Sequence, residues 1–196
     1  LELNGIDGDV GFLVQPGAYA GFYSIREYPR TSPALGVNFT AEPGTVFHLI
    51  PSEPYPTDNF IFRLVGADNI TFDGLMMETQ TVSTQSRFIQ TIGKCDNLQI
   101  LNCQFDLFNN SHQGVNTGTS ISENLLIDQC AFSEGSYGVV ISGDYYNSNR
   151  YRNVTIRNSA FTNIGYPLHF SFFFFKQKTA YEIEAFTTAF QLASTG

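Results

Sequence analysis

The sequence predicts an all-β solenoid, in which short strands wind into stacked coils, and three observations lead to this prediction. Four nine-residue segments align without gaps, and their leading asparagines recur every 27 to 29 residues. Apolar and polar residues alternate at the start of each segment, as in a strand with one buried face. Phe (19), Tyr (10) and Gly (17) are abundant and only 14% of the residues are charged, which is typical of a β-rich, turn-rich domain.

The repeated segments share one frame: Asn, apolar, any, apolar, any, any, small or apolar, any, and then Phe or Met. They are Asn69–Met77, Asn97–Phe105, Asn124–Phe132 and Asn153–Phe161. A second apolar strand is expected later in each unit, at residues 88–92, 114–117, 138–141 and 168–170. Turn residues lie between the strands, as in 66–69 and 93–97.

One such unit cannot bury its own apolar face, so successive units must stack about 4.8 Å apart as parallel strands. Equivalent residues then form columns along the stack. We expect an interior stack of Met77, Phe105, Phe132 and Phe161, and an aliphatic column of Phe72, Ile100, Ile127 and Ile156. We expect the leading asparagines to form a turn ladder, because their amides can pair with the next coil and tolerate left-handed backbone geometry; these are Asn69, Asn97, Asn124 and Asn153.

Other repeat architectures fit less well. The leucine-rich pattern L-x-x-L-x-L-x-x-N is not met, because Asn leads this frame instead of following it. A flat β-sandwich predicts shorter spacing between strands and no fixed frame.

Three further segments carry a resemblance to a known family. They are Val14-Gln-Pro-Gly-Ala-Tyr19, Gly36-Val-Asn-Phe-Thr-Ala41 and Leu64-Val-Gly-Ala-Asp-Asn-Ile-Thr-Phe72. The first resembles a "V-x-P-G-x-Y" first coil and the last an "L-x-G-A-x-x-I-T-F" coil of the right-handed parallel β-helix proteins of the pectate-lyase-like superfamily. More narrowly, the chain resembles secreted or surface β-helix proteins of Bacteroidetes-type bacteria. The resemblance covers roughly residues 8–170 and implies a right-handed parallel β-helix; it implies little about function.

The predicted organisation is a β-helix fragment over residues 1–171, incomplete at both ends, with coils starting near residues 10, 37, 60, 88, 114, 138 and 166. Residues 172–196 are expected to be a non-native tail. Phe172–Phe175 corresponds to a run of T bases, and Lys176–Ile183 resembles a translated sequencing-library adapter. The alternative is a genuine amphipathic cap, and resequencing the gene across codon 171 distinguishes the two.

The net charge of −8 and the lack of a Lys/Arg cluster disfavour nucleic acid and anionic membranes as partners. No apolar span suggests membrane insertion. The resemblance implies an extracellular or cell-surface location and a polysaccharide or surface glycan as partner. No cofactor is indicated: Cys and His spacing does not suggest zinc, and calcium, which lyases of this superfamily use, would need a stacked carboxylate trio that the frame lacks.

Candidate carbohydrate-binding residues come from two segments. The loop 144–151 interrupts the repeat with Asp144, Tyr145, Tyr146 and Arg150, side chains that stack on sugar rings or bond hydroxyls; a solvated insertion is the alternative. Asp106 and His112 could line a groove, although solvation of the turn at 109–112 is the favoured interpretation of His112. The N-T-D, D-D, G-H-G and R-I-K motifs of polygalacturonases are missing, so no catalytic residue is assigned.

Several residues that could carry chemistry are expected to be structural. His48 and His169 are expected to face outward from strands. Asp128 and Arg157 share the fifth frame position and are expected to form an external ion pair. Cys103 and Cys130 are expected to stack as small apolar residues, with a disulfide possible only if their Cα atoms lie about 4.4–6.8 Å apart.

The sequence therefore favours a structural or glycan-binding module of a larger secreted or surface protein. A polysaccharide lyase or glycoside hydrolase, with active residues near 106–112 or in missing coils, is the second hypothesis. A trimeric phage tailspike or fibre is the third.

Overall fold

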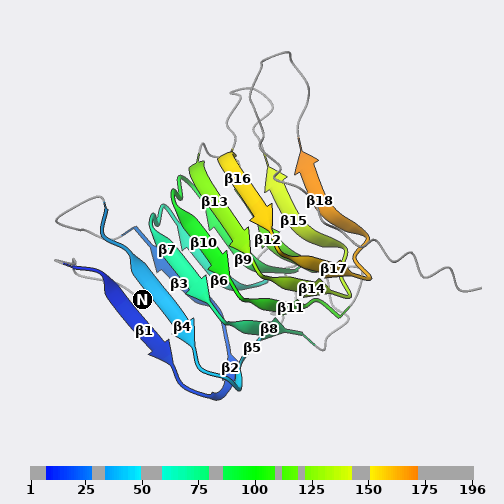
Figure 1. The fold of residues 1–196 in the computed structure, drawn as a ribbon, viewed down its shortest axis with the longest axis horizontal. Coiled ribbons are helices and arrows are strands. Elements are labelled where there is room, and N and C mark those ends of the chain that lie inside the picture. The colour runs from blue at the N-terminus through cyan, green and yellow to red at the C-terminus, as the bar shows by residue number, and fades with distance from the viewer. Residues whose placement is uncertain are drawn as a thin grey trace, which may run out of the picture.

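A computed structural model describes residues 8–27, 34–49, 59–79, 86–108, 112–118, 122–142 and 151–171. The described elements are all β-strands, arranged in three six-stranded sheets (Figure 1). Every listed strand pair is parallel, and each sheet takes every third strand of the chain. The fold is therefore a parallel β-solenoid, which confirms the predicted all-β parallel architecture.

Each coil contributes one strand to each sheet. Sheet 1 contains β1 (Val10–Val14), β4 (Val37–Ala41), β7 (Ile70–Asp73), β10 (Leu98–Leu101), β13 (Ser122–Asp128) and β16 (Tyr151–Arg157). Sheet 2 contains β2 (Gly17–Ala20), β5 (Thr45–His48), β8 (Met76–Glu78), β11 (Gln104–Asp106), β14 (Ala131–Ser133) and β17 (Ala160–Thr162). Sheet 3 contains β3 (Tyr23–Arg26), β6 (Phe60–Val65), β9 (Ser86–Ile92), β12 (His112–Asn116), β15 (Tyr137–Ser142) and β18 (Tyr166–Ser171).

The nine-residue frame contains two strands, and the sequence analysis recognised only the first of them. Positions two to five lie in sheet 1 and positions eight and nine in sheet 2, with a bend between them. The sixth position has positive φ in each repeat, at Gly74 (73°), Asn102 (53°), Gln129 (55°) and Asn158 (51°). This left-handed residue turns the chain within two residues, and the three-residue strand that follows is too short to show a period.

The predicted coil starts mix two sheets. Residues 10 and 37 open strands of sheet 1, whereas 60 and 166 open strands of sheet 3 and 88, 114 and 138 lie one or two residues inside them. The predicted non-native tail, 172–196, lies outside the described residues.

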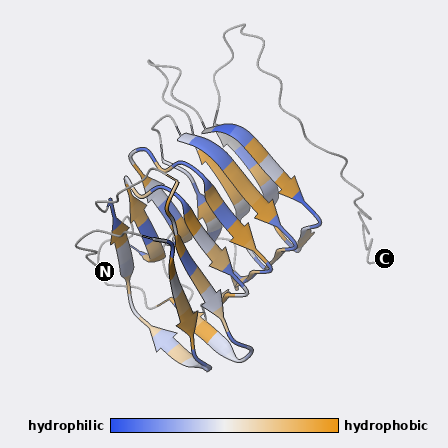
Figure 2. Cartoon of the chain, turned by 60° about the vertical axis from the view of Figure 1, so that its left-hand side comes forward, coloured by the Kyte–Doolittle hydropathy of each residue, from blue (hydrophilic) through white to orange (hydrophobic). Residues whose placement is uncertain are grey.

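The core is a set of residue columns that run along the stack. Met77, Phe105, Phe132 and Phe161 are in register. The rings of Phe105 and Phe132 lie 4.3 Å apart at an interplanar angle of 6°, and those of Phe132 and Phe161 lie 4.9 Å apart at the same angle. Apolar segments recur at matching places on neighbouring strands (Figure 2).

A second interior column lies on sheet 1. Phe72, Ile100 and Ile127 are fully buried and in register, and Ile156 follows them. Burial of these side chains supplies the main free energy of folding, at roughly 1.5–3 kcal/mol for each fully buried large apolar residue. No helix long and apolar enough to cross a membrane occurs in the described part of the chain.

Candidate functional site

The distinctive loop that sequence analysis selected falls between two described strands. Asp144, Tyr145, Tyr146 and Arg150 lie outside the described residues, since β15 ends at Ser142 and β16 begins at Tyr151. Their role in binding stays a prediction.

Asp106 and His112 lie on either side of the corner between sheets 2 and 3. Asp106 ends β11, is half-buried, and lies in register with Glu78 and Ser133. His112 begins β12 in register with Ser86 and is fully buried. The expected solvated turn at His112 is wrong, because the third-sheet strand begins two residues earlier than the apolar pattern at 114–117 indicates.

The outer face of sheet 3 gathers an aromatic cluster that the sequence analysis did not select. Tyr137 on β15 is in register with Tyr166 on β18, and their rings stack 5.1 Å apart at an interplanar angle of 17°. The ring of His169 meets Tyr137 edge-on at 5.2 Å and lies 6.4 Å from Tyr166. Tyr166 is 58% exposed, so the cluster presents a ring to solvent.

Polar side chains continue this face across the neighbouring strands. On β12, Asn116 Nδ2 donates a hydrogen bond to Gln113 Oε1 at 2.6 Å. Gln90 Oε1 on β9 accepts a hydrogen bond from Nε of Arg63 on β6 at 3.0 Å. The Arg63 guanidinium also lies 3.9 Å from the centre of the Phe60 ring. We call these residues of β6, β9, β12, β15 and β18 the sheet 3 face.

The residues between these outward positions point into the solenoid. Phe62, Ile89, Val115 and Val139 are in register and at most 3% exposed. The sheet 3 face therefore rests on a packed apolar column, which holds its side chains in position. Its five strands extend about 19 Å across the sheet at the usual strand spacing.

One sequence signal could have identified the tyrosines. Tyr137 and Tyr166 each follow the leading asparagine of their repeat, Asn124 and Asn153, by 13 residues. The signal was missed because only two repeats carry it and because the outer side of a strand leaves no apolar pattern.

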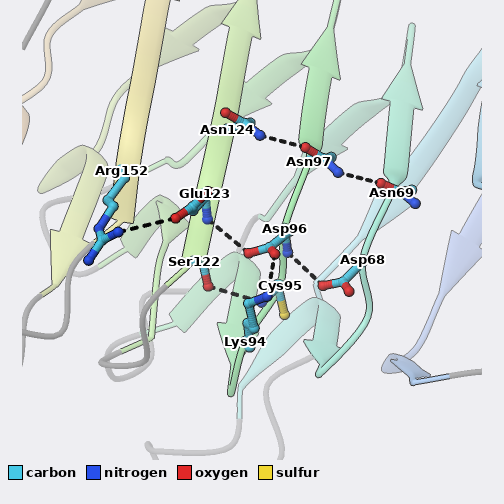
Figure 3. A network of polar contacts seen from close by, with 10 residues as sticks. All are labelled: Asp68, Asn69, Lys94, Cys95, Asp96, Asn97, Ser122, Glu123, Asn124 and Arg152. Carbon is cyan, nitrogen blue, oxygen red and sulfur yellow. Dashed lines mark hydrogen bonds and ion pairs between the residues drawn. The ribbon is translucent and has the colours of Figure 1, made fainter. Parts of the chain in front are cut away.

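The corner between sheets 3 and 1 carries two polar ladders (Figure 3). Each leading asparagine donates from Nδ2 to Oδ1 of the one before it, at 2.6 Å from Asn97 to Asn69, 2.7 Å from Asn124 to Asn97 and 2.9 Å from Asn153 to Asn124. All four have positive φ, between 54° and 63°. The geometry matches the turn ladder described from the sequence.

The second ladder is acidic and satisfies backbone donors. The Asp68 carboxylate accepts the backbone N–H of Asp96 at 2.7 Å, and the Asp96 carboxylate accepts that of Glu123 at 2.9 Å. Lys94 and Arg152 pair with Asp96 and Glu123, at 2.6 and 3.3 Å. These carboxylates therefore have structural partners (Figure 3). Within the described ranges, His, Cys, Asp and Glu side chains form no group of three or more that could hold a metal ion.

The predicted ion pair of Asp128 and Arg157 is present. The two residues are in register, and Arg157 Nη2 lies 2.8 Å from Asp128 Oδ2. Asn158 Nδ2 donates to Asp128 Oδ1 at 3.0 Å. The hydrogen bond from Arg157, followed by that from Asn158, lowers the pKa of the Asp128 carboxyl against the opposing effect of burial.

The two strand histidines are both half-buried. His48 Nδ1 on β5 lies 3.0 Å from Glu78 Oε1 on the adjacent β8, so this side chain lies on the outer side of sheet 2. His169 belongs to the sheet 3 face described above. The chain matches no known protein-family model, no curated protein and no solved structure.

Proposed function

We propose that the chain is a polysaccharide-binding module that holds an extended glycan against the sheet 3 face. The exposed, stacked pair of Tyr137 and Tyr166 carries the proposal. An aromatic ring supported from behind by a second ring is a flat apolar platform, which suits the C–H face of a sugar ring.

The polar part of the face supplies complementary chemistry. Gln90, Gln113 and Asn116 offer amide donors and acceptors for sugar hydroxyls, and Arg63 adds a planar cationic donor. A row of aromatic and amide groups on a flat sheet fits a linear polymer better than a compact ligand. The proposal includes an extracellular or cell-surface location and the pectate-lyase-like relationship, both of which rest on the sequence resemblance.

Affinity electrophoresis through gels containing neutral or acidic polysaccharides tests this function. We expect at least one polymer to retard the wild-type chain, and we expect Tyr166→Ala to weaken retardation about tenfold, since stacking of one ring on one sugar contributes about 1–2 kcal/mol. Phe108→Ala is the matched control, because Phe108 is 45% exposed but lies outside this face. Equal retardation of Tyr166→Ala and the wild type would refute the proposed face.

Carbohydrate hydrolysis is the second candidate, and one observation favours it. Glu78 and Asp106 occupy adjacent strands of sheet 2 in register, so their backbones lie about 4.8 Å apart. The paired carboxylates of retaining glycosidases are about 5–5.5 Å apart. New reducing ends from a polysaccharide, lost in both Glu78→Gln and Asp106→Asn, would support hydrolysis; their persistence in both variants would exclude this pair.

A further inference from the structure

Cys103 and Cys130 occupy the same position in consecutive coils. They precede Gln104 and Ala131, which are in register on β11 and β14, and the backbone N–H of Ala131 donates to the carbonyl of Cys103 at 2.9 Å. Neighbouring strands lie about 4.8 Å apart, which falls within the Cα separation of about 4.4–6.8 Å that a disulfide requires. The backbone therefore meets the distance condition for a covalent link.

The two side chains point to the same place in the core. Cys103 is 0% exposed and Cys130 is 2% exposed, and their thiols are hydrogen-bonded to each other. Burial raises the pKa of the Cys103 thiol, whereas the hydrogen bond from Cys103 lowers the pKa of Cys130. Cys130 is therefore the better thiolate of the pair, and Cys103 is placed to resolve a mixed disulfide.

The third cysteine provides an internal comparison. Cys95 is also fully buried, but the residue beside it in the next coil is Ser122, whose Oγ accepts the Cys95 backbone N–H at 2.9 Å. Cys95 therefore has no cysteine in the adjacent coil to link to.

We propose that Cys103 and Cys130 form a disulfide that links two consecutive coils when the chain folds in the presence of a small-molecule disulfide such as oxidised glutathione. The Cys130 thiolate attacks one glutathione sulfur, forms a mixed disulfide and releases one glutathione thiolate. Cys103 then loses its proton and attacks the Cys130 sulfur, releasing the second thiolate. Two thiols are oxidised and one glutathione disulfide is reduced to two glutathione molecules.

Burial determines when this exchange occurs. Both sulfurs are inaccessible in the finished stack, so the oxidant reaches them while the coils are still open. Once formed, the bond closes a loop between positions 27 residues apart. It restricts the unfolded chain, and the chain-entropy model predicts a melting temperature about 7–14 °C higher than that of the reduced protein.

The test is to refold the full chain in a glutathione redox buffer, alkylate the remaining thiols, and map the products by mass spectrometry. We expect one peptide pair joined through Cys103 and Cys130, in the wild type and in Cys95→Ser, with only Cys95 alkylated in the wild type. Cys103→Ser should lose the link. Three alkylated cysteines in folded wild-type protein, or a link to Cys95, would overturn the proposal. Equal melting temperatures of linked and reduced protein would overturn the stabilising role.

Discussion

Asn124 donates a hydrogen bond from its side-chain amide to the side-chain oxygen of Asn97, 27 residues earlier in the chain, at 2.7 Å. The bond is one step of a ladder in which each amide serves as both donor and acceptor. The same residues hold a left-handed backbone, at φ 57° for Asn97 and 63° for Asn124. The ladder therefore combines two separable contributions, the amide bonds and the tolerance of positive φ.

Two substitutions at Asn97 separate these contributions. Asn97→Ala should lower the free energy of unfolding by about 2–3 kcal/mol, because it loses the amide bonds and places a Cβ in the left-handed region. Asn97→Gly should cost less, since it loses only the bonds and keeps the favourable backbone. Chemical denaturation measures both. A glycine variant no more stable than the alanine variant would contradict this account.

The interior aromatic column leaves no room for a side chain at Gly114 on β12. A Cβ there would lie 2.8 Å from two atoms of the Phe132 ring and 2.6 Å from the Gly138 carbonyl oxygen. Gly114→Ala should therefore destabilise the fold by about 1–3 kcal/mol.

A double-mutant cycle identifies the ring as part of the cause. Phe132→Leu should destabilise on its own, and the double variant should be more stable than the sum of the two single changes predicts, because the smaller side chain relieves one contact. Additive losses, measured by denaturant unfolding, would show that the Gly138 carbonyl alone sets the cost.

The Asp128–Arg157 pair predicts a pH dependence of stability. The pKa of Asp128 is lower in the folded than in the unfolded chain, so its contribution is present above the unfolded pKa of about 3.9 and is lost as the pH falls through the folded pKa. The wild type should therefore exceed Asp128→Asn in melting temperature near pH 7, and the difference should shrink below about pH 4.

A matched exposed pair controls for general charge effects. Glu123→Gln removes the partner of Arg152, and both of these side chains are more than two-fifths exposed. This variant should change the melting temperature little at any pH, because solvent screens the interaction. A pH-independent difference for Asp128→Asn would show that the ion pair does not contribute.

The buried thiol of Cys95 predicts protection from alkylation. Burial raises its pKa to about 11, so the unreactive thiol form dominates at neutral pH. Iodoacetamide should leave Cys95 unlabelled in the native protein and label it fully in denaturant. Because the folded pKa is raised, the stability from this group is complete below the unfolded pKa of about 8.5 and is lost as the pH rises through about 11.

The aromatic platform makes a further prediction about the proposed glycan site. Tyr166→Phe should keep most of the binding that Tyr166→Ala loses, because the ring face, rather than the hydroxyl, supplies the stacking surface. Tyr137→Leu should also weaken binding, since it removes the supporting ring. Isothermal titration with the retarding polysaccharide measures both. A phenylalanine variant as weak as the alanine variant would shift the recognition to the hydroxyl.

The sequence alone determined the repeat, its strand periodicity and the residues that share a column. Each coil must bury its apolar side against the next, so a 27-to-29-residue period with matching apolar positions is written directly into the chain. Phe105 above Phe132 and Asn97 above Asn124 follow from that period.

Only the tertiary structure decided how each coil is bent and what its outer faces carry. The left-handed bend at Asn102 creates a separate short strand that has no readable period of its own. His112 is buried because of where its strand begins, a boundary that local sequence does not mark. Tyr137 and Tyr166 meet because two complete coils bring them together, and an outward side chain leaves no apolar pattern by which such a contact could be predicted.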